Sequence, residues 1–177
     1  EFDLHKVHKA GARFSKEKAE WFNHQYLQKK NNSELISLLK NIDEVQKSQI
    51  SENRLEKIIS LMKERATFVK DIYNEGKFFF IAPSIFDEKG VKKAWKNDTS
   101  EIITNLYEVL KEQENFSVES IKETIHHFTE SKELGMGRVM MPLRLALVGE
   151  LTGPDVPEIM ELIGKEETLK RIQFILN

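Results

Sequence analysis

Apolar residues at helical spacing constrain this chain more than any other feature. Between residues 51 and 76 they recur at intervals that place them on one face of an α-helix. The positions follow i, i+3, i+4, i+7, i+11 and i+14, and they are Leu55, Ile58, Ile59, Met62, Ala66 and Val69. This spacing predicts one helix of about five turns, with Ser51 as its N-cap and Gly76 as its end.

The second half of the chain repeats this helical pattern. Apolar stripes over 102–110 and 118–128 predict two helices, the second capped by Ser117 and ended by Gly135, with Gly135-Met136-Gly137 as its terminator. Three shorter helices are expected over 143–148, begun by Pro142 and ended by Gly149, over 159–163, ended by Gly164, and over 165–176. Residues 77–82 are compatible with a short extended segment, which Pro83 limits.

The scarcity of strand-like alternation predicts an all-α fold. Two polar stretches, Gln28–Ser33 and Lys96–Ser100, are candidate junctions between units. Dividing the chain at both gives three segments, residues 1–30, 31–97 and 98–177. The later two are expected to be small helical lobes.

Composition limits the chemistry and the partners. Basic residues number 27 and acidic residues 29, so nucleic-acid binding would need a local basic patch. The absence of cysteine excludes disulfides, thiolate metal sites and cysteine nucleophiles. No apolar run reaches the roughly 18 residues of a membrane span, so a membrane partner is not expected. No acyl-transfer triad or phosphate-cradling motif is visible, so no catalytic residue is predicted.

The histidines are the only candidates for a metal site. His5 and His8 are three residues apart, and His126 and His127 are adjacent. A metal site needs three or four converging ligands, and adjacent helical residues point about 100° apart. We therefore expect partly exposed histidines and no metal.

Two arginines stand out in the apolar segment 137–157. Arg138 and Arg144 are the only basic residues there, and burying an arginine without a partner is costly. One interpretation is a buried ion pair with an acidic neighbour such as Glu150 or Glu158. The other is an arginine at the rim of a pocket that presents its planar guanidinium to a nucleotide base, beside the main-chain groups of the turn 152–154.

The residues around this segment resemble the C-terminal part of bacterial glutamyl-tRNA synthetases. The resemblance is carried by the blocks 140–149, 153–154, 158–159 and 162–166, with Arg171 at its end. Further matches lie earlier in the chain, in the same order as in the family. They are Phe14, Lys18, Trp21, Asn23, Tyr26-Leu27, Lys63-Glu64-Arg65-Ala66 and Phe78-Phe79-Phe80.

The resemblance implies a pair of helical lobes that form an anticodon-binding cage. In that family the lobes read an anticodon with a central uracil and a third-position cytosine. Residues 1–30 would be the tail of the preceding stem-contact domain, residues 31–97 the proximal lobe and residues 98–177 the distal lobe. The RNA-binding residues implied by the motif are Arg65, Arg138, Arg144, Gly153, Pro154 and Val156. Arg65 would help decide the third base, Arg144 would contact a base, and Arg138 would meet a backbone phosphate.

The resemblance also implies a partner and a parent enzyme. The partner is the anticodon loop of tRNA(Glu), and the parent attaches glutamate to that tRNA with ATP and magnesium. The family's nucleotide-binding signatures are absent from this sequence. The chain is therefore expected to be a catalytically inactive fragment without a cofactor, working beside the catalytic domain of its parent as a cytoplasmic monomer. A helical protein-interaction module without RNA binding is the alternative.

Overall fold

The computed structural model describes residues 15–177, and within this range the chain consists of helices, turns and loops without a β-strand. The all-α prediction is therefore confirmed. Phe14, His5, His8 and the rest of the first fourteen residues lie outside the described part. The helical elements are α1 (Lys16–Lys29), α2 (Asn32–Leu39), α3 (Asp43–Lys47), α4 (Glu52–Lys63), α5 (Val69–Glu75), the 3₁₀ turn η2 (Lys77–Phe79), α6 (Glu88–Ala94), α7 (Thr99–Glu112), α8 (Val118–Ser131), α9 (Gly137–Val148), α10 (Val156–Ile163) and α11 (Lys165–Leu176).

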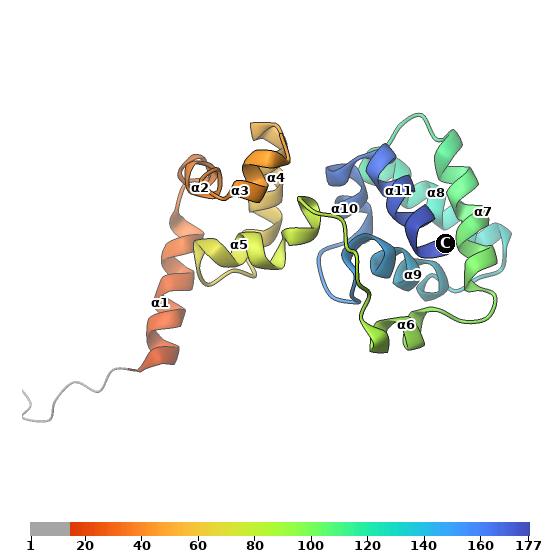
Figure 1. The fold of residues 1–177 in the computed structure, drawn as a ribbon, viewed down its shortest axis with the longest axis horizontal. Helices are drawn as coiled ribbons and strands as arrows, with labels where there is room; N and C mark the ends of the chain where they lie inside the picture. The colour runs from red at the N-terminus through yellow and green to blue at the C-terminus, as the bar shows by residue number, and fades with distance from the viewer. Residues whose placement is uncertain (1–14) are drawn as a thin grey trace, which may run out of the picture.

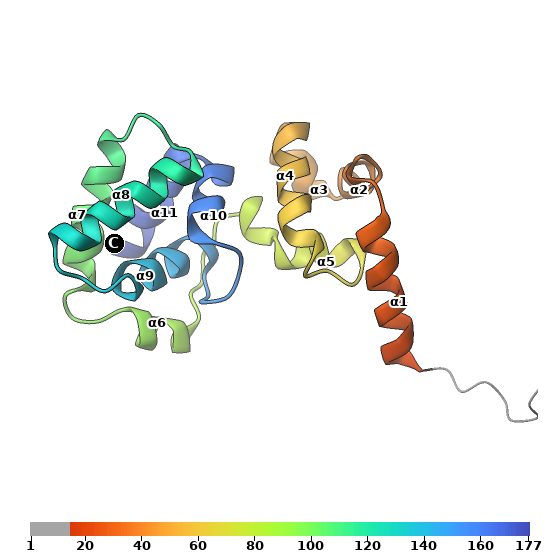
Figure 2. The same ribbon diagram turned by 180° about the vertical axis from the view of Figure 1, so that it is seen from behind.

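The helices gather into two lobes joined through η2 (Figure 1). In the first lobe, α2, α4 and α5 pack on one another. In the second, α9 lies at the centre and contacts α6, α7, α10 and α11, while α8 covers the side seen in Figure 2. The two lobes meet where α10 contacts α4 and η2. Because α6 packs on α9, it belongs spatially with the helices that follow it, and the predicted division after residue 97 stays a prediction.

Local signals fixed several helix ends as expected. Ser51 caps α4 by accepting a hydrogen bond from the amide of Arg54, and Ser117 caps α8 by accepting one from Ser120. Gly164, at φ 86°, separates α10 from α11, and α11 covers the predicted residues 165–176. These ends depend on residues at the cap or within three positions of it.

The predicted five-turn helix over 51–76 is wrong, because α4 ends at Lys63 and α5 begins only at Val69. The Asp71 carboxylate accepts hydrogen bonds from the amides of Thr67 and Phe68 and so starts a new helix. Two carbonyl oxygens at the break also contact polar side chains of α1. His24 Nδ1 lies 2.8 Å from the Ala66 oxygen, and Gln28 Nε2 donates to the Lys63 oxygen at 2.6 Å.

The expected end of α8 at Gly135 is also wrong. The helix ends at Ser131, and Glu133, with φ 53°, takes the left-handed conformation that glycine usually supplies. The amide of Leu134 then donates to the Thr129 oxygen at 2.9 Å, and the amide of Glu133 to the Glu130 oxygen at 3.1 Å. This pattern is a Schellman motif, which stops the helix before Gly135 is reached.

Two further expectations are corrected around the second lobe. Gly137 begins α9 and does not terminate a helix, so Pro142 lies inside α9 rather than at its start. The Pro142 ring removes one backbone hydrogen bond from the helix. Burial of Val139 before it and of Leu143 and Ala146 after it stabilises α9 on both sides of the proline. Residues 77–79 form the turn η2 and not an extended segment.

Candidate nucleic-acid interface

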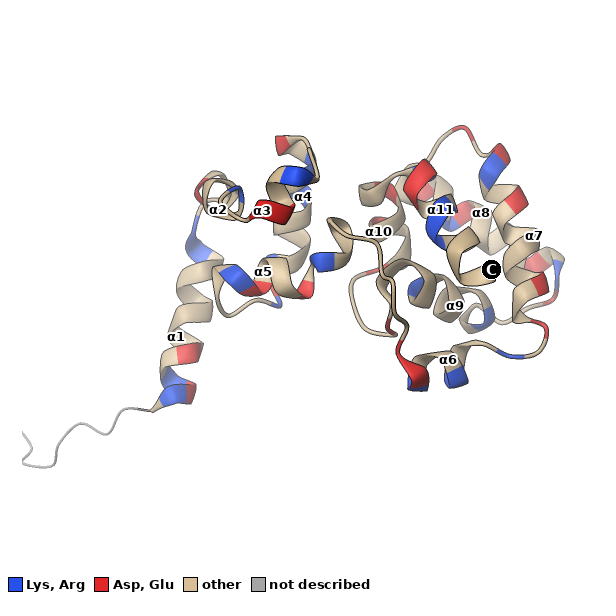
Figure 3. Cartoon of the chain, viewed as in Figure 1, with Lys and Arg blue, Asp and Glu red and all other residues tan. Residues whose placement is uncertain are grey.

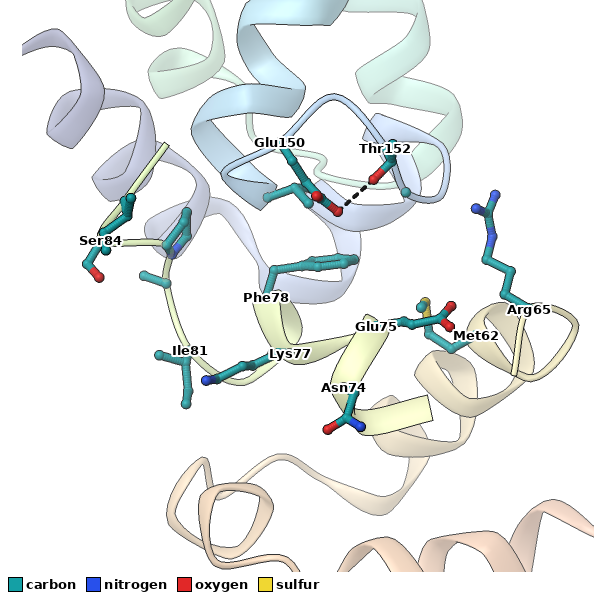
Figure 4. A pocket seen from close by; sticks show the side chains of 15 residues that line it. Met62, Arg65, Asn74, Glu75, Lys77, Phe78, Ile81, Ser84, Glu150 and Thr152 are labelled. Carbon is teal, nitrogen blue, oxygen red and sulfur yellow. Dashed lines mark hydrogen bonds between the residues drawn. The ribbon is translucent and has the colours of Figure 1, made fainter. Parts of the chain in front are cut away.

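A cleft of about 710 Å³ lies between the two lobes. One wall comes from the end of α4 and from η2 and carries Arg65, Lys77 and Phe78. The facing wall is the loop after α9 and carries Glu150 and Thr152 (Figure 4). The cleft therefore combines the cationic groups of Arg65 and Lys77 and an aromatic ring with the carboxylates of Glu75 and Glu150. Cationic and aromatic groups are those that proteins use to hold single-stranded nucleic acid.

Arg65 is exposed in the turn between α4 and α5 and lines the cleft. Its position depends on the helix break described above. If α4 had continued, residues 64–68 would have followed the helix axis. The carbonyl bonds from His24 and Gln28 hold this turn on the side of α1, so the Arg65 side chain is carried by a fixed backbone.

Arg144 lies on the other lobe, half-buried near the end of α9. Its NH1 group donates a hydrogen bond of 2.5 Å to the Pro154 carbonyl oxygen. Burial lowers the pKa of the Arg144 guanidinium, the Asp155 carboxylate opposes this, and the Arg65 charge lowers the pKa further. Arg144 itself does not line the cleft, but its NH1 group lies against Gly153, which does. Arginine remains charged at neutral pH.

Arg144 forms no ion pair with any carboxylate of residues 15–177, so the ion-pair interpretation of this arginine is wrong. Neither Glu150 nor Glu158 pairs with it. The Glu150 carboxylate instead accepts a hydrogen bond of 2.6 Å from the Thr152 hydroxyl, within the cleft wall. The remaining donors of the Arg144 fork are not taken by a carboxylate of the described chain.

The turn 152–155 is fitted closely around Arg144. Gly153 has φ 128°, and a Cβ atom there would lie 3.3 Å from Arg144 NH1. Pro154 is buried, and Val156 is fully buried at the start of α10. Of the three predicted turn residues, Gly153 lines the cleft, whereas Pro154 and Val156 support the turn from within.

Arg138 is placed apart from the other predicted arginines. It lies six residues before Arg144, about 9 Å along α9, and it does not line the cleft. Its NH2 group lies 2.5 Å from the Asp98 carboxylate. This hydrogen bond is the main cause that lowers the pKa of Asp98. The predicted phosphate contact of Arg138 stays a prediction.

Sequence reasoning gave Arg171 no role, although the structure makes it the most deeply buried arginine described, at 4% exposure. Its NH1 group donates to the carbonyl oxygens of Phe78 (2.7 Å) and Leu147 (2.8 Å), and its Nε donates to Glu167 (2.8 Å). Burial lowers its pKa, and Glu167 opposes the shift. The available signal was Glu167, one turn earlier on the same helix face.

Metal-binding geometry is not found in the described chain, since no three His, Asp or Glu side chains within 15–177 gather around one point. His126 and His127 are exposed near Glu130, whereas His5 and His8 lie outside the described residues. None of the helices described has the length and apolar character of a membrane-spanning segment.

Known proteins match the chain over almost its whole length. The profile of a family described as the anticodon binding domain matches residues 16–176. Glutamate–tRNA ligases of Christiangramia forsetii and Porphyromonas gingivalis are 48% and 42% identical over 172 residues, which are 97% of this chain and 34% of each relative. The crystal structure of a glutamate–tRNA ligase from Elizabethkingia meningosepticum in complex with its amino acid superimposes with a TM-score of 0.91 at 58% identity, over 99% of this chain and 35% of that one.

Proposed function

Because the chain belongs to the anticodon binding domain family, we propose that its interlobe cleft binds the anticodon loop of a tRNA. The names of the relatives point to tRNA(Glu) as the partner. The observation that carries the proposal is the make-up of the cleft walls: Arg65 and Lys77 line one side, and the turn at Thr152 and Gly153, which Arg144 supports, lines the other. A single-stranded loop inserted there would meet the Arg65 guanidinium on one side and the turn supported by Arg144 on the other.

The proposed reading of the bases follows from hydrogen-bond geometry. The planar fork of an arginine matches the O2 and N3 acceptors of cytosine and also stacks on a neighbouring base. We assign Arg65 to the third anticodon base and Arg144 to a base beside the turn 152–154. A base without the matching acceptors would leave a donor unsatisfied, at a cost of about 1–3 kcal/mol, or roughly 5- to 150-fold in affinity.

The packing of the walls supports this selectivity. Leu143, Leu147 and Ile159 are fully buried behind the loop that carries Glu150 and Thr152. Arg171 joins the main chain of η2 to that of α9. A wall fixed at both ends cannot move to accommodate a wrong base, so a mismatch is expected to appear as lost affinity.

We extend the proposal to the longer protein with the relatives as a guide. The chain spans about a third of the length of the curated relatives it matches. Attachment of glutamate to tRNA(Glu), with ATP and magnesium, is proposed for the portion of the relatives that this chain does not match. The chain itself is proposed to act as a monomer in the cytoplasm, in contact with the catalytic domain of its parent.

A titration of anticodon stem-loops tests the function. The full chain is titrated with the tRNA(Glu) stem-loop and with stem-loops changed at the second or third anticodon base, at one fixed salt concentration. We expect the changed loops to bind at least fivefold more weakly. Equal affinity for all the loops would contradict anticodon recognition, and an absence of RNA binding would favour a protein-interaction module.

A further inference from the structure

One basic surface outside the cleft is not used by the proposed base recognition. Residues 89–96 hold four lysines, Lys89, Lys92, Lys93 and Lys96, all exposed. The first three follow i, i+3 and i+4 on α6, which places them on one face of the helix, and Lys96 follows directly after its end. We call these four residues the α6 lysine face.

The fold turns this face outward. The opposite side of α6 carries Gly90 and Ala94, which are buried against the second lobe. A Cβ atom at Gly90 would lie 3.2 Å from Leu145 and 3.4 Å from Leu151, so the helix is seated closely on α9 and on the loop after it. Rotation of α6 would bury lysines and expose this contact, so the orientation of the lysine face is fixed.

The lysines of this face have no carboxylate partner within residues 15–177. Lys30, Lys40, Lys57, Lys111 and Lys122 each pair with an acid. The Lys96 ammonium instead donates to the Lys92 carbonyl oxygen at 3.2 Å. Figure 3 shows the basic positions on α6, with acidic residues confined to its beginning. Four clustered charges without counter-ions favour an anionic partner.

The α6 lysine face continues from the rim of the cleft. The amide of Asp87, which caps α6, donates to the Gly149 carbonyl oxygen at 2.8 Å, and Ile85 lines the cleft itself. From Ile85 to Lys93 the chain covers at most about 18 Å, as three extended residues and five helical ones. Arg138, which pairs with Asp98 two residues beyond Lys96, lies at the far end of the same stretch.

We propose that the α6 lysine face binds the phosphate backbone of the tRNA whose anticodon loop occupies the cleft. This inference rests on the proposed function and adds to it a second contact surface, for the stem beside the loop. Phosphate contacts contribute affinity and orientation but no base specificity. The lysine face therefore strengthens the binding of every anticodon equally, while the arginines of the cleft distinguish among them.

The test compares two triple variants of the full chain, each lacking three positive charges. The first is Lys89→Gln, Lys92→Gln and Lys93→Gln. The control is Lys29→Gln, Lys47→Gln and Lys111→Gln, which removes exposed lysines from the last turns of α1, α3 and α7. Lys92 and Lys93 also lie in a last turn, so the control matches their effect on the helix dipole. Circular dichroism verifies that both variants are folded.

The measurement is the affinity for cognate and changed stem-loops as a function of salt. Each lost phosphate contact lowers the slope of log K against log salt by about 0.7–0.9, so the α6 variant should lose about 2–3 units of slope. The ratio of wild-type affinity to α6-variant affinity should therefore fall by roughly 20- to 40-fold when the salt concentration is raised from 50 to 200 mM. The ratio of cognate to changed affinity should stay as in the wild type, and the control variant should change little.

The outcomes separate this inference from the proposed function. If the wild type discriminates among anticodons but the α6 variant keeps the slope of the control, the lysine-face proposal is overturned. If the wild type does not discriminate while the α6 variant still loses slope, the lysine face binds RNA and anticodon recognition fails. Unchanged RNA binding together with lost sedimentation on phosphatidylserine vesicles would overturn the proposal in favour of a membrane surface.

Discussion

The guanidinium group of Arg171 donates a hydrogen bond of 2.7 Å to the carbonyl oxygen of Phe78, 93 residues earlier in the chain. The same nitrogen donates to the Leu147 carbonyl oxygen at 2.8 Å. One buried side chain on α11 therefore joins the connection between the lobes to the helix that carries Arg144. The relative position of the cleft walls depends on this contact.

Replacing Arg171 should destabilise the fold strongly. Arg171→Met fills similar space but leaves two buried carbonyls and Glu167 without their donor, so the free energy of unfolding should fall by about 3 kcal/mol. Urea unfolding followed by circular dichroism measures the change. The exposed neighbour serves as the control, since Lys170→Met should alter stability by less than about 0.5 kcal/mol. Equal stability of the two variants would argue against the role of Arg171.

Replacing Arg144 should reduce both binding and selectivity. Arg144→Ala removes the proposed base contact and the bond to the Pro154 oxygen, so cognate stem-loop affinity should fall by roughly 5- to 150-fold and approach that for changed loops. Arg144→Lys keeps the charge without the planar fork and should recover salt-dependent affinity but not selectivity. Fluorescence titration with both loops measures this. An unaltered affinity ratio in folded Arg144→Ala would refute the proposed base contact.

Gly149 should not tolerate a side chain. Its φ of 89° is left-handed, and a Cβ atom would lie 3.0 Å from both the Ile85 oxygen and the Pro83 Cβ. Gly149→Ala should cost about 1–2 kcal/mol of unfolding free energy from backbone strain, with the close contacts adding to it. Gly135→Ala is the matched control, since a Cβ atom there meets nothing within 4 Å. Thermal unfolding compares the two, and similar melting temperatures would contradict the strain at Gly149.

The pair between Arg138 and Asp98 should give a pH-dependent contribution to stability. The hydrogen bond from Arg138 lowers the pKa of Asp98 from its ordinary value of 3.8. A carboxyl with a lowered folded-state pKa stabilises the fold above its ordinary pKa, and this stabilisation is lost as pH falls through the folded value. Asp98→Asn should therefore be less stable than the wild type at pH 6.

The same comparison at low pH provides the check on the Asp98 prediction. As the pH falls well below 3.8, protonation of Asp98 makes the wild type resemble Asp98→Asn, so the difference in unfolding free energy should disappear. Asparagine keeps the shape of the side chain, and the Asp98 side chain makes no capping hydrogen bond to α7, so the substitution isolates the charge. A stability difference that is the same at both pH values would show that the ion pair is not its source.

The helix ends that the sequence predicted correctly depend on neighbouring residues. Ser51 and Ser117 act on amides three residues ahead, and Gly164 acts through its own backbone conformation. The break between α4 and α5 was missed because it depends partly on His24 and Gln28, which lie 42 and 35 residues away from the carbonyls they contact. The spacing of apolar residues reports only which face of a helix is buried, so it carries no information about hydrogen-bond partners this distant in sequence.

The candidate site was predicted only in part for the same reason. Arg65 was identified through a resemblance of motifs, and Arg144 first through its place in an apolar segment. The structure places them on different lobes, and of the two only Arg65 lines the cleft. The roles of Arg138 and Arg171 depend on Asp98 and Phe78, which are 40 and 93 residues distant in sequence. The α6 lysine face was missed because its significance comes from the absence of paired acids and from its place beside the cleft.

The joint at η2 has a consequence for how recognition could change. Arg65 and Arg144 belong to different halves of the molecule, so the gap between them is a property of the hinge and not of either half. A substitution near Phe78 or Arg171 would widen or narrow that gap while leaving every residue proposed to touch RNA intact. New decoding preferences could therefore evolve, or be engineered, from the hinge.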